Sequence, residues 1–298
     1  MSTPLLHLED RLTHLSISPA LGGSLVNWTA KEGGHALLRH SDQAAPEAGT
    51  PRRLACYPLA PWSNRIAEGG FDGPDGWLPL APNTDHDPYP IHGSAWQQPW
   101  QVAEHRASRL SLYLESSVPF AYRAEQHITL DEGQLSIELL VTHQDARAAW
   151  HGLGLHPYVT RTAHTLLQAP ARAVWLGDAG QLANREQDIP AKWDFRTAAA
   201  LPEDLLDNAF SGWSGQCRIV QPDLGYELAC QATGADYYLV YCPEGKDFFC
   251  FEPVSHPINA HHLPGHPGLQ LLRQGQSTRL LYRMQYHSLH GETGVPAK

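Results

Sequence analysis

Hydrophobic and polar residues alternate along most of this chain. The alternation is clearest over residues 109–115, 134–139 and 279–286, where every second side chain is apolar. A period of two places successive side chains on opposite faces of a β-strand, so these runs predict strands with one buried face and one polar face.

Turn-forming residues separate the alternating runs and predict β-hairpins, because Asp and Gly favour tight turns between strands. Two such turns are predicted: Asp131–Gly133 between residues 125–130 and 134–142, and Asp223–Gly225 between residues 218–221 and 226–231.

Long helices have little room in a chain of 298 residues with 24 Pro and 25 Gly. We predict short helices only, at Pro202–Asn208 and Pro257–His262. No linker divides the sequence, and no repeat of fixed period is found. The pattern therefore predicts an all-β protein, a large antiparallel β-sandwich forming one domain over residues 1–290, with a disordered tail over residues 291–298.

Charge and hydropathy exclude several functional classes. The chain carries 21 Lys and Arg against 31 Asp and Glu, a net charge of −10, so it has no electrostatic footprint for nucleic acid or for an anionic membrane. The first residues do not form a secretion signal, and no run approaches the roughly 20 apolar residues of a membrane helix. We expect a cytoplasmic protein.

Cysteine and histidine spacing does not indicate a metal site. The five cysteines are odd in number and form no Cys-x-x-Cys pair, so we expect reduced, buried thiols. His261, His262 and His266 lie close in sequence, but adjacent side chains diverge and Pro264 intervenes. We expect no metal.

Glu252 is a carboxylate in the otherwise apolar run of residues 250–254. Burial of a carboxylate is unfavourable unless the group is paired or used, and burial raises its pKa toward the range of a general base. An ion pair with a neighbouring strand is the alternative. His92 and His156 each follow an apolar residue and precede Gly or Pro, and with Glu252 they could form a proton-transfer site.

Five short motifs in a fixed order resemble those of the aldose 1-epimerase (galactose mutarotase) family, and together they span about residues 58–257. In this sequence they read Asn64-Arg65, His92-Gly93, His156-Pro157-Tyr158, Asp207 and Glu252-Pro253.

The resemblance implies a β-supersandwich with a sugar in an open cleft, and the interconversion of the α and β anomers of a free aldose. Opening a pyranose ring requires a base at the anomeric hydroxyl and an acid at the ring oxygen. Glu252 suits the base and His156 the acid, and the resemblance assigns His92 to assist the acid. It implies no metal and no organic cofactor.

The resemblance also implies a set of substrate-binding residues. Asn64 and Arg65 are expected to hold sugar hydroxyls, Asp207 to accept hydrogen bonds from hydroxyls distant from the reacting carbon, and Tyr158 to stack on the ring. The alternatives are a core histidine at His156 or His92, a structural ion pair at Arg65 and a turn cap at Asp207.

Three further aromatic or imidazole side chains have no assigned role. Trp62 and Trp96 lie within the motif segments, but a chain with nine Trp gives no basis for choosing either as a sugar platform. His151 lies five residues before His156, and an odd separation on a regular strand directs the two side chains to opposite faces.

Other functions stay open. A non-catalytic carbohydrate-binding or sugar-sensing protein could use the same cleft, and Arg52, Arg53 and Arg65 suggest a hexose-6-phosphate mutarotase. A glycoside-processing enzyme would need a second carboxylate, for which Asp207 is the candidate. The expected partner is a monosaccharide, with no nucleic acid and no membrane, and the expected state is a monomer or a weak homodimer.

Overall fold

The secondary structure of the computed structural model consists of β-strands and very short 3-10 helices, which confirms the predicted all-β class. The structure describes residues 4–41, 44–177 and 181–289. The predicted tail at residues 291–298 lies outside these residues. The short helices of the described chain are Pro46–Ala48, Pro51–Arg53, Ala95–Gln97, Ala191–Trp193, Pro222–Leu224 and Ala260–His262.

The largest sheet is antiparallel throughout and contains nine strands among the described residues. In spatial order these are β17 (Ala199–Ala200), β14 (Leu166–Gln168), β19 (Gln216–Gln221), β20 (Tyr226–Thr233), β24 (Ser277–Ser288), β10 (Gln134–His143), β9 (Tyr122–Asp131), β8 (Arg109–Ser116) and β7 (Gln101–His105).

A second antiparallel sheet of eight strands packs against the first. Its order is β16 (Ala183–Asp188), β15 (Ala173–Gly177), β18 (Leu206–Ser211), β21 (Tyr237–Cys242), β22 (Phe248–Val254), β12 (Gly154–Leu155) and β4 (Pro58–Leu59), and β13 (Tyr158–Thr160) also pairs with β22. The smaller sheets are β1 (Leu6–Glu9) with β2 (Thr13–Ser18) and β3 (Ser24–Ala30), β5 (Gly70–Gly73) with β6 (Gly76–Pro79), and β11 (Ala149–His151) with β23 (Gln270–Leu272).

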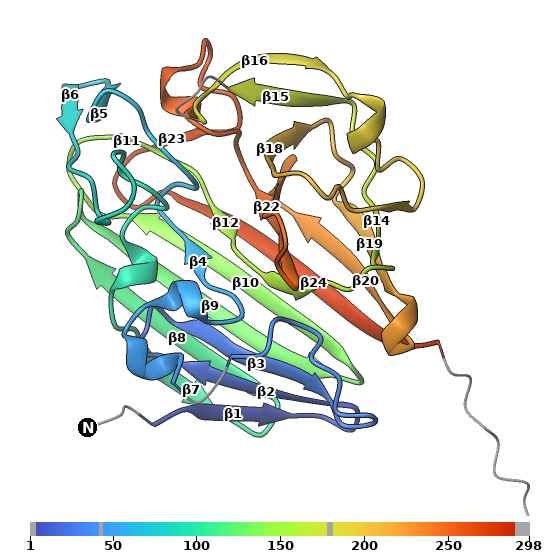
Figure 1. Cartoon of the computed structure of the whole chain (residues 1–298). Coiled ribbons are helices and arrows are strands. Elements are labelled where there is room, and N and C mark those ends of the chain that lie inside the picture. Colours follow the sequence, from blue (N-terminus) through green and yellow to red (C-terminus); the bar gives the residue numbers. More distant parts are fainter. Residues whose placement is uncertain (1–3, 42–43, 178–180, 290–298) are drawn as a thin grey trace, which may run out of the picture.

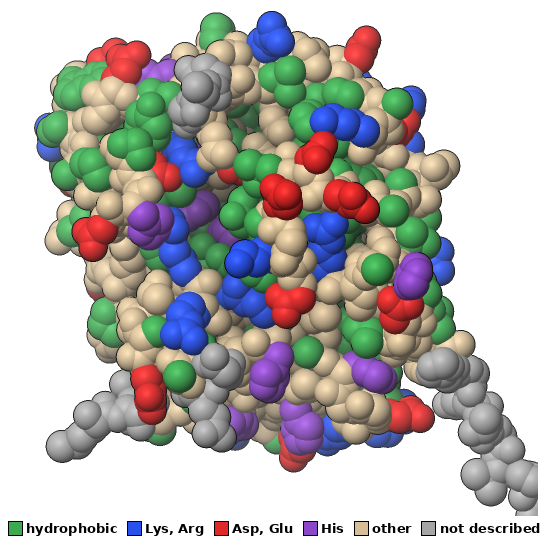
Figure 2. Space-filling view, in the orientation of Figure 1, with side chains coloured by type: hydrophobic (Ala, Val, Ile, Leu, Met, Phe, Trp, Pro, Cys, Tyr) green, Lys and Arg blue, Asp and Glu red, His purple; other side chains and the backbone are tan. Residues whose placement is uncertain are grey.

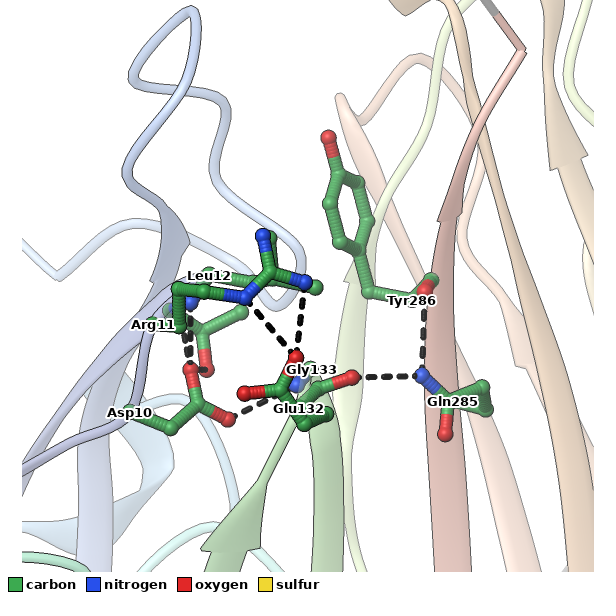
Figure 3. Close-up of polar contacts among 8 residues, drawn as sticks. Asp10, Arg11, Leu12, Glu132, Gly133, Gln285 and Tyr286 are labelled. Atoms are coloured by element: carbon green, nitrogen blue, oxygen red, sulfur yellow. Dashed lines mark hydrogen bonds and ion pairs between the residues drawn. The ribbon is translucent and has the colours of Figure 1, made fainter. Parts of the chain in front are cut away.

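The predicted turn between β9 and β10 is confirmed. Glu132 and Gly133 both have positive φ, 47° and 79°, as two-residue hairpin turns require. Figure 3 shows this turn joined to the N-terminal sheet: the Gly133 N–H donates to the Asp10 carboxylate at 2.7 Å, and Arg11 pairs with Glu132. Gln285 of β24 donates to the Glu132 carbonyl at 3.0 Å, so the turn connects three segments distant in sequence.

The second predicted hairpin is confirmed, and the helix predictions are corrected. β19 and β20 pair across residues 222–225. The predicted helix at Pro202–Asn208 is wrong, because β18 begins at Leu206 and pairs with β21 along its whole length. Sheet pairing and the burial of Phe210 override the local helix preference here. The helix predicted at Pro257–His262 is reduced to the 3-10 turn Ala260–His262.

Side chains from both large sheets form one hydrophobic core. Leu139 and Tyr282 come from the nine-stranded sheet, and Phe210, Phe249 and Phe251 come from the eight-stranded sheet. Alternation therefore directs one face of each sheet into the sandwich, as the sequence pattern predicts. Figure 1 shows β4, β12 and β22 near the middle of the view, over the long strands β10 and β24.

The other face of β22 is also buried. Cys250 and Val254 belong to a second apolar cluster with Tyr57, Trp96 and other residues from the loops over this sheet. Glu252 lies between Cys250 and Val254 on the same face of the strand and is 1% exposed. The fold thus places a carboxylate beneath loops rather than in solvent.

All five cysteines are free and buried, as expected. No helix among the residues that the structure describes is long and apolar enough to cross a membrane.

Candidate functional site

A cavity of about 360 Å³ opens on the outer face of the eight-stranded sheet. Figure 2 shows a hollow near the middle of this face, with basic and histidine side chains around it. The structure brings all seven predicted site residues to this cavity: His92, His156, Glu252, Asn64, Arg65, Tyr158 and Asp207.

Three strands hold His156 in place. Gly154 pairs with both Val254 of β22 and Leu59 of β4, and the His156 N–H then donates to the Tyr57 carbonyl at 3.0 Å. The imidazole ring contacts two tyrosine rings, with centroids 4.6 Å from Tyr57 and 4.7 Å from Tyr158, and the two tyrosine centroids are 6.1 Å apart. This stacking limits the rotation of the His156 ring.

His156 and Glu252 are in direct contact, with Nε2 and Oε1 3.4 Å apart. Burial raises the pKa of Glu252 well above its ordinary value, and the nearby Asp207 adds to the rise. Burial lowers the pKa of His156 to about 3. These shifts favour a neutral pair, in which Glu252 is protonated and His156 is a neutral imidazole. Glu252 Oε2 and His156 Nδ1 are buried without a hydrogen-bond partner.

Hydrogen bonds to Asn64 fix the orientation and the tautomer of His92. The backbone N–H of Asn64 donates to His92 Nδ1 at 3.1 Å. The backbone N–H of His92 donates to the Asn64 carbonyl at 3.0 Å. Burial and the charges of neighbouring groups lower the pKa of His92 well below its ordinary value. Because Nδ1 accepts a hydrogen bond, the neutral ring carries its proton on Nε2.

The segments of the Asn-Arg and His-Gly motifs lie against each other. Gly93 has φ +64°, and a Cβ atom at this position would lie 2.1 Å from the Ala60 carbonyl oxygen. Glycine is therefore required both by the left-handed backbone and by the close approach of the two segments. His92 itself has φ 63°.

Arg65 is held by two carboxylates. Its Nε donates to Asp87 at 2.8 Å, and its Nη1 lies 3.8 Å from Asp207. Asn64 Oδ1 also accepts from the Arg65 N–H at 2.9 Å. Burial raises the pKa of Asp207, against the effect of the Arg65 charge. Asp207 lies on β18, not at the end of a helix as predicted.

Several residues near the cavity were not predicted. Asp87 orients Arg65, but it lies in a loop and belongs to none of the five motifs. Arg39 was not predicted either, because it reaches the site through a loop contact, in which the Arg39 backbone N–H donates to the Tyr158 carbonyl. The other unpredicted lining residues are Tyr57, Ile91, Gln181, Leu205, Tyr241 and Phe248.

The side chains without an assigned role lie elsewhere. Trp62 and Trp96 are buried and do not line the cavity, although Trp96 packs against the Tyr57 ring. His151 is buried away from the cavity and bonds to His143 at 2.9 Å. Of the three arginines considered for phosphate, Arg52 and Arg65 line the cavity and Arg53 does not.

His156, Cys250 and Glu252 each place one potential metal-ligand atom within 4.8 Å of the others. Burial raises the pKa of the Cys250 thiol well above its ordinary value. A metal ion would have to displace the proton of this thiol, whereas the contact of His156 with Glu252 serves proton transfer as it stands. Metal-free chemistry stays an expectation.

Comparisons with known proteins place the chain in a family. A family model for aldose 1-epimerase matches residues 4–285. The uncharacterized Escherichia coli K12 protein YphB is 34% identical over 242 residues, which cover 78% of this chain and 83% of the relative. The uncharacterized YihR of the same organism is 30% identical over 282 residues, covering 89% and 87%.

Solved structures agree with this assignment. A crystal structure of a candidate aldose 1-epimerase from Escherichia coli K12 is 31% identical, with a TM-score of 0.89 over 96% of this chain and 99% of that one. A galactose mutarotase-like protein from Clostridium acetobutylicum has a TM-score of 0.85 at 14% identity, over 95% and 94% of the two chains, which shows the shared fold. The chain belongs to the aldose 1-epimerase family.

Proposed function

We propose that this protein is an aldose mutarotase, which interconverts the α and β anomers of a monosaccharide by acid–base ring opening and closing. The observation that carries the proposal is the 3.4 Å contact of His156 Nε2 with Glu252 Oε1 at the cavity. A carboxyl group and an imidazole that exchange one proton can act as the general base and the general acid that move a proton between two sugar oxygens.

The proposed reaction begins when the shared proton moves from Glu252 to His156 Nε2. The pKa shifts of the two groups favour the proton on the carboxyl group, and sugar hydroxyls that donate to Glu252 stabilise the carboxylate and shift this balance. Glu252 then takes the proton from the anomeric hydroxyl. The bond from carbon 1 to the ring oxygen breaks as the carbonyl forms, and His156 gives its proton to the ring oxygen.

Ring closure uses the same groups in reverse. Rotation about the bond between carbons 1 and 2 presents the other carbonyl face to the hydroxyl, which returns its proton to His156 as the ring forms. Glu252 returns a proton to the new anomeric oxygen, so no proton is consumed. His92 Nε2–H is a donor for negative charge that develops on the ring oxygen. Arg65 and Asp207, which line the cavity, would hold hydroxyls of the sugar.

The test is anomer exchange measured by polarimetry or by saturation-transfer NMR with free aldoses. We expect the Glu252→Gln variant to lose about 10²- to 10⁴-fold in kcat, because it removes a general base while preserving side-chain shape. Glu104→Gln is the matched control, since Glu104 is paired with Arg106 at the exposed strand β7. A Glu252→Gln variant with the full rate would exclude the proposed base.

A non-catalytic sugar-binding protein is the main alternative. Calorimetry that detects sugar binding, in a protein that does not accelerate anomer exchange, would favour it over the mutarotase. A chromogenic glycoside that releases its leaving group would instead indicate hydrolysis. Hydrolysis is disfavoured because Asp207, the candidate second carboxylate, lies 3.8 Å from the Arg65 guanidinium.

A further inference from the structure

Two arginines lie over aromatic rings of the cluster that packs against His156. The guanidinium carbon of Arg39 lies 3.6 Å from the centre of the Tyr158 ring, and that of Arg52 lies 5.6 Å from the centre of the Trp96 ring. Both side chains line the cavity, and both of their charges help to lower the pKa of His156. Positive charge is therefore concentrated beside the proposed acid.

Neither arginine has an acidic partner within the described part of the chain. Arg39 Nη2 donates to the backbone carbonyls of Arg52 at 2.7 Å and Leu54 at 2.5 Å, and Arg52 Nη1 contacts the His86 ring. The Nε atoms of both arginines are buried without a partner. Arg65, in contrast, is neutralised by two carboxylates.

Partly buried guanidinium groups without counter-charges are unfavourable unless an anion completes the site. The chain as a whole is acidic, with a net charge of −10, so carboxylates are plentiful, yet none of the described ones pairs with Arg39 or Arg52. Guanidinium groups bind carboxylate and phosphate oxygens through paired, charge-assisted hydrogen bonds. An anionic group on the ligand would supply the missing partner.

The proposed chemistry says where on the sugar that group would lie. Glu252 acts at the oxygen on carbon 1 and His156 acts at the ring oxygen, whose other neighbour is carbon 5. Carbon 5 of a hexopyranose bears the exocyclic carbon 6, which therefore extends past His156 on the side away from Glu252. The Arg65 guanidinium lies beside Asp207, whereas those of Arg39 and Arg52 lie over the rings of Tyr158 and Trp96, and the Tyr158 ring stacks on His156.

We propose that the cavity takes an aldose with an anionic group, a carboxylate or a phosphate, at carbon 6, and that Arg39 and Arg52 bind this group. The inference rests on the proposed mutarotase function, because it uses the positions of Glu252 and His156 along the ring. The Arg65–Asp207 end would then hold the uncharged hydroxyls at carbons 2 and 3.

The experiment compares matched sugars in the full-length protein. Saturation-transfer NMR gives kcat/KM for anomer exchange, and calorimetry gives Kd, for glucuronate, glucose 6-phosphate and glucose, and for galacturonate and galactose. We expect at least one anionic sugar to exceed its neutral counterpart by about tenfold to a hundredfold, the range for charged hydrogen bonds. The carboxylate and phosphate arms identify which anion is preferred. Equal kcat/KM and Kd values for charged and neutral sugars would overturn the inference.

Variants of Arg52 test the site directly. Arg52→Gln should reduce the ratio of anionic to neutral kcat/KM by about tenfold, and Arg52→Lys, which keeps the charge, should retain part of it. Arg106→Gln removes an arginine paired at the exposed surface and should leave the ratio unchanged. A ratio that is the same in Arg52→Gln and in the unchanged protein would contradict the inference.

The two proposals fail in different ways. If neutral sugars exchange anomers and charged sugars gain nothing, the anion site is wrong and the mutarotase stands. If an anionic sugar binds, Arg52→Gln weakens that binding, and no sugar exchanges faster than in buffer, then the anion site stands and the mutarotase is wrong.

Discussion

A single hydrogen bond from the backbone decides what His92 can do. The Asn64 N–H occupies Nδ1, so the neutral ring presents an N–H donor at Nε2. The role of His92 is therefore fixed by a neighbour 28 residues away in sequence rather than by the imidazole alone. A donor that stays neutral can stabilise a developing oxyanion without competing for the proton of His156.

His92→Asn tests this role. We expect kcat for anomer exchange to fall by about 10²-fold, the usual effect of removing one preorganised donor. Asn tolerates the left-handed backbone at φ 63°, so the melting temperature should change little. A variant that keeps its kcat would show that His92 only supports the loop.

The residues that could be predicted from the sequence are those whose chemistry conflicts with their surroundings. Glu252 stood out because a carboxylate interrupts an apolar strand, and His156 because it follows an apolar residue and precedes Pro157. Asp87 and Arg39 could not be found this way. Both lie in loops, where a charged side chain is ordinary, and only long-range contacts bring them to the site.

At the scale of elements, the part of the site around His92 depends on the contact between two loops rather than on a regular strand pair. Two isolated β-bridges, Arg65–Ile91 and Ala60–Gly93, join the segments of the Asn-Arg and His-Gly motifs. The short strand β4 is the only regular strand within these described segments. Alternation predicted the long strands correctly, because their period of two is uninterrupted. It could not predict this loop pairing, which follows from positive φ angles and tertiary contacts.

Gly93→Ala should separate these loops. The new methyl group meets the Ala60 carbonyl oxygen at 2.1 Å in addition to the strain of φ +64°. We expect a loss of more than about 1 kcal/mol in the free energy of unfolding, together with a fall in kcat as His92 moves.

Gly49→Ala is the matched control for this variant. Gly49 has φ +67° but no atom within 4 Å of the added Cβ, so the substitution introduces the backbone strain without the collision. Chemical denaturation and anomer exchange should show a smaller loss of stability than in Gly93→Ala, and an unchanged kcat. Equal effects of the two variants would show that close packing of the loops is unimportant.

At the scale of the whole molecule, histidines buried in their neutral form join distant segments. His256 Nδ1–H donates to the Pro257 carbonyl at 2.8 Å, and its Nε2 accepts from the Ser63 N–H at 3.0 Å. A second proton on this ring, at Nε2, would face the Ser63 N–H, so two donors would meet without an acceptor. His256 thus connects the end of β22 to the loop of the Asn-Arg motif only while it is neutral.

Acid should therefore destabilise the fold well before the carboxylates are protonated. Burial lowers the pKa of His256 to about 4, and that of His151 and His156 to about 3. The unfolded chain, with histidine pKa values near 6.5, binds more protons between about pH 4 and pH 6.5, so stability is complete above this window and declines as the pH falls through it. Each such histidine contributes a slope of about 1.4 kcal/mol per pH unit.

Denaturant titrations from pH 7 to pH 4.5 measure this slope, and His256→Gln isolates one contribution. Gln can accept from Ser63 without titrating, so we expect the variant to be less stable at pH 7 and to lose about 1.4 kcal/mol per pH unit of the slope. An unchanged slope in His256→Gln would mean that this ring is protonated without breaking its contacts.

Because one core joins both large sheets, we also expect a single unfolding transition for the chain. Two separated transitions would mean that the sheets unfold independently.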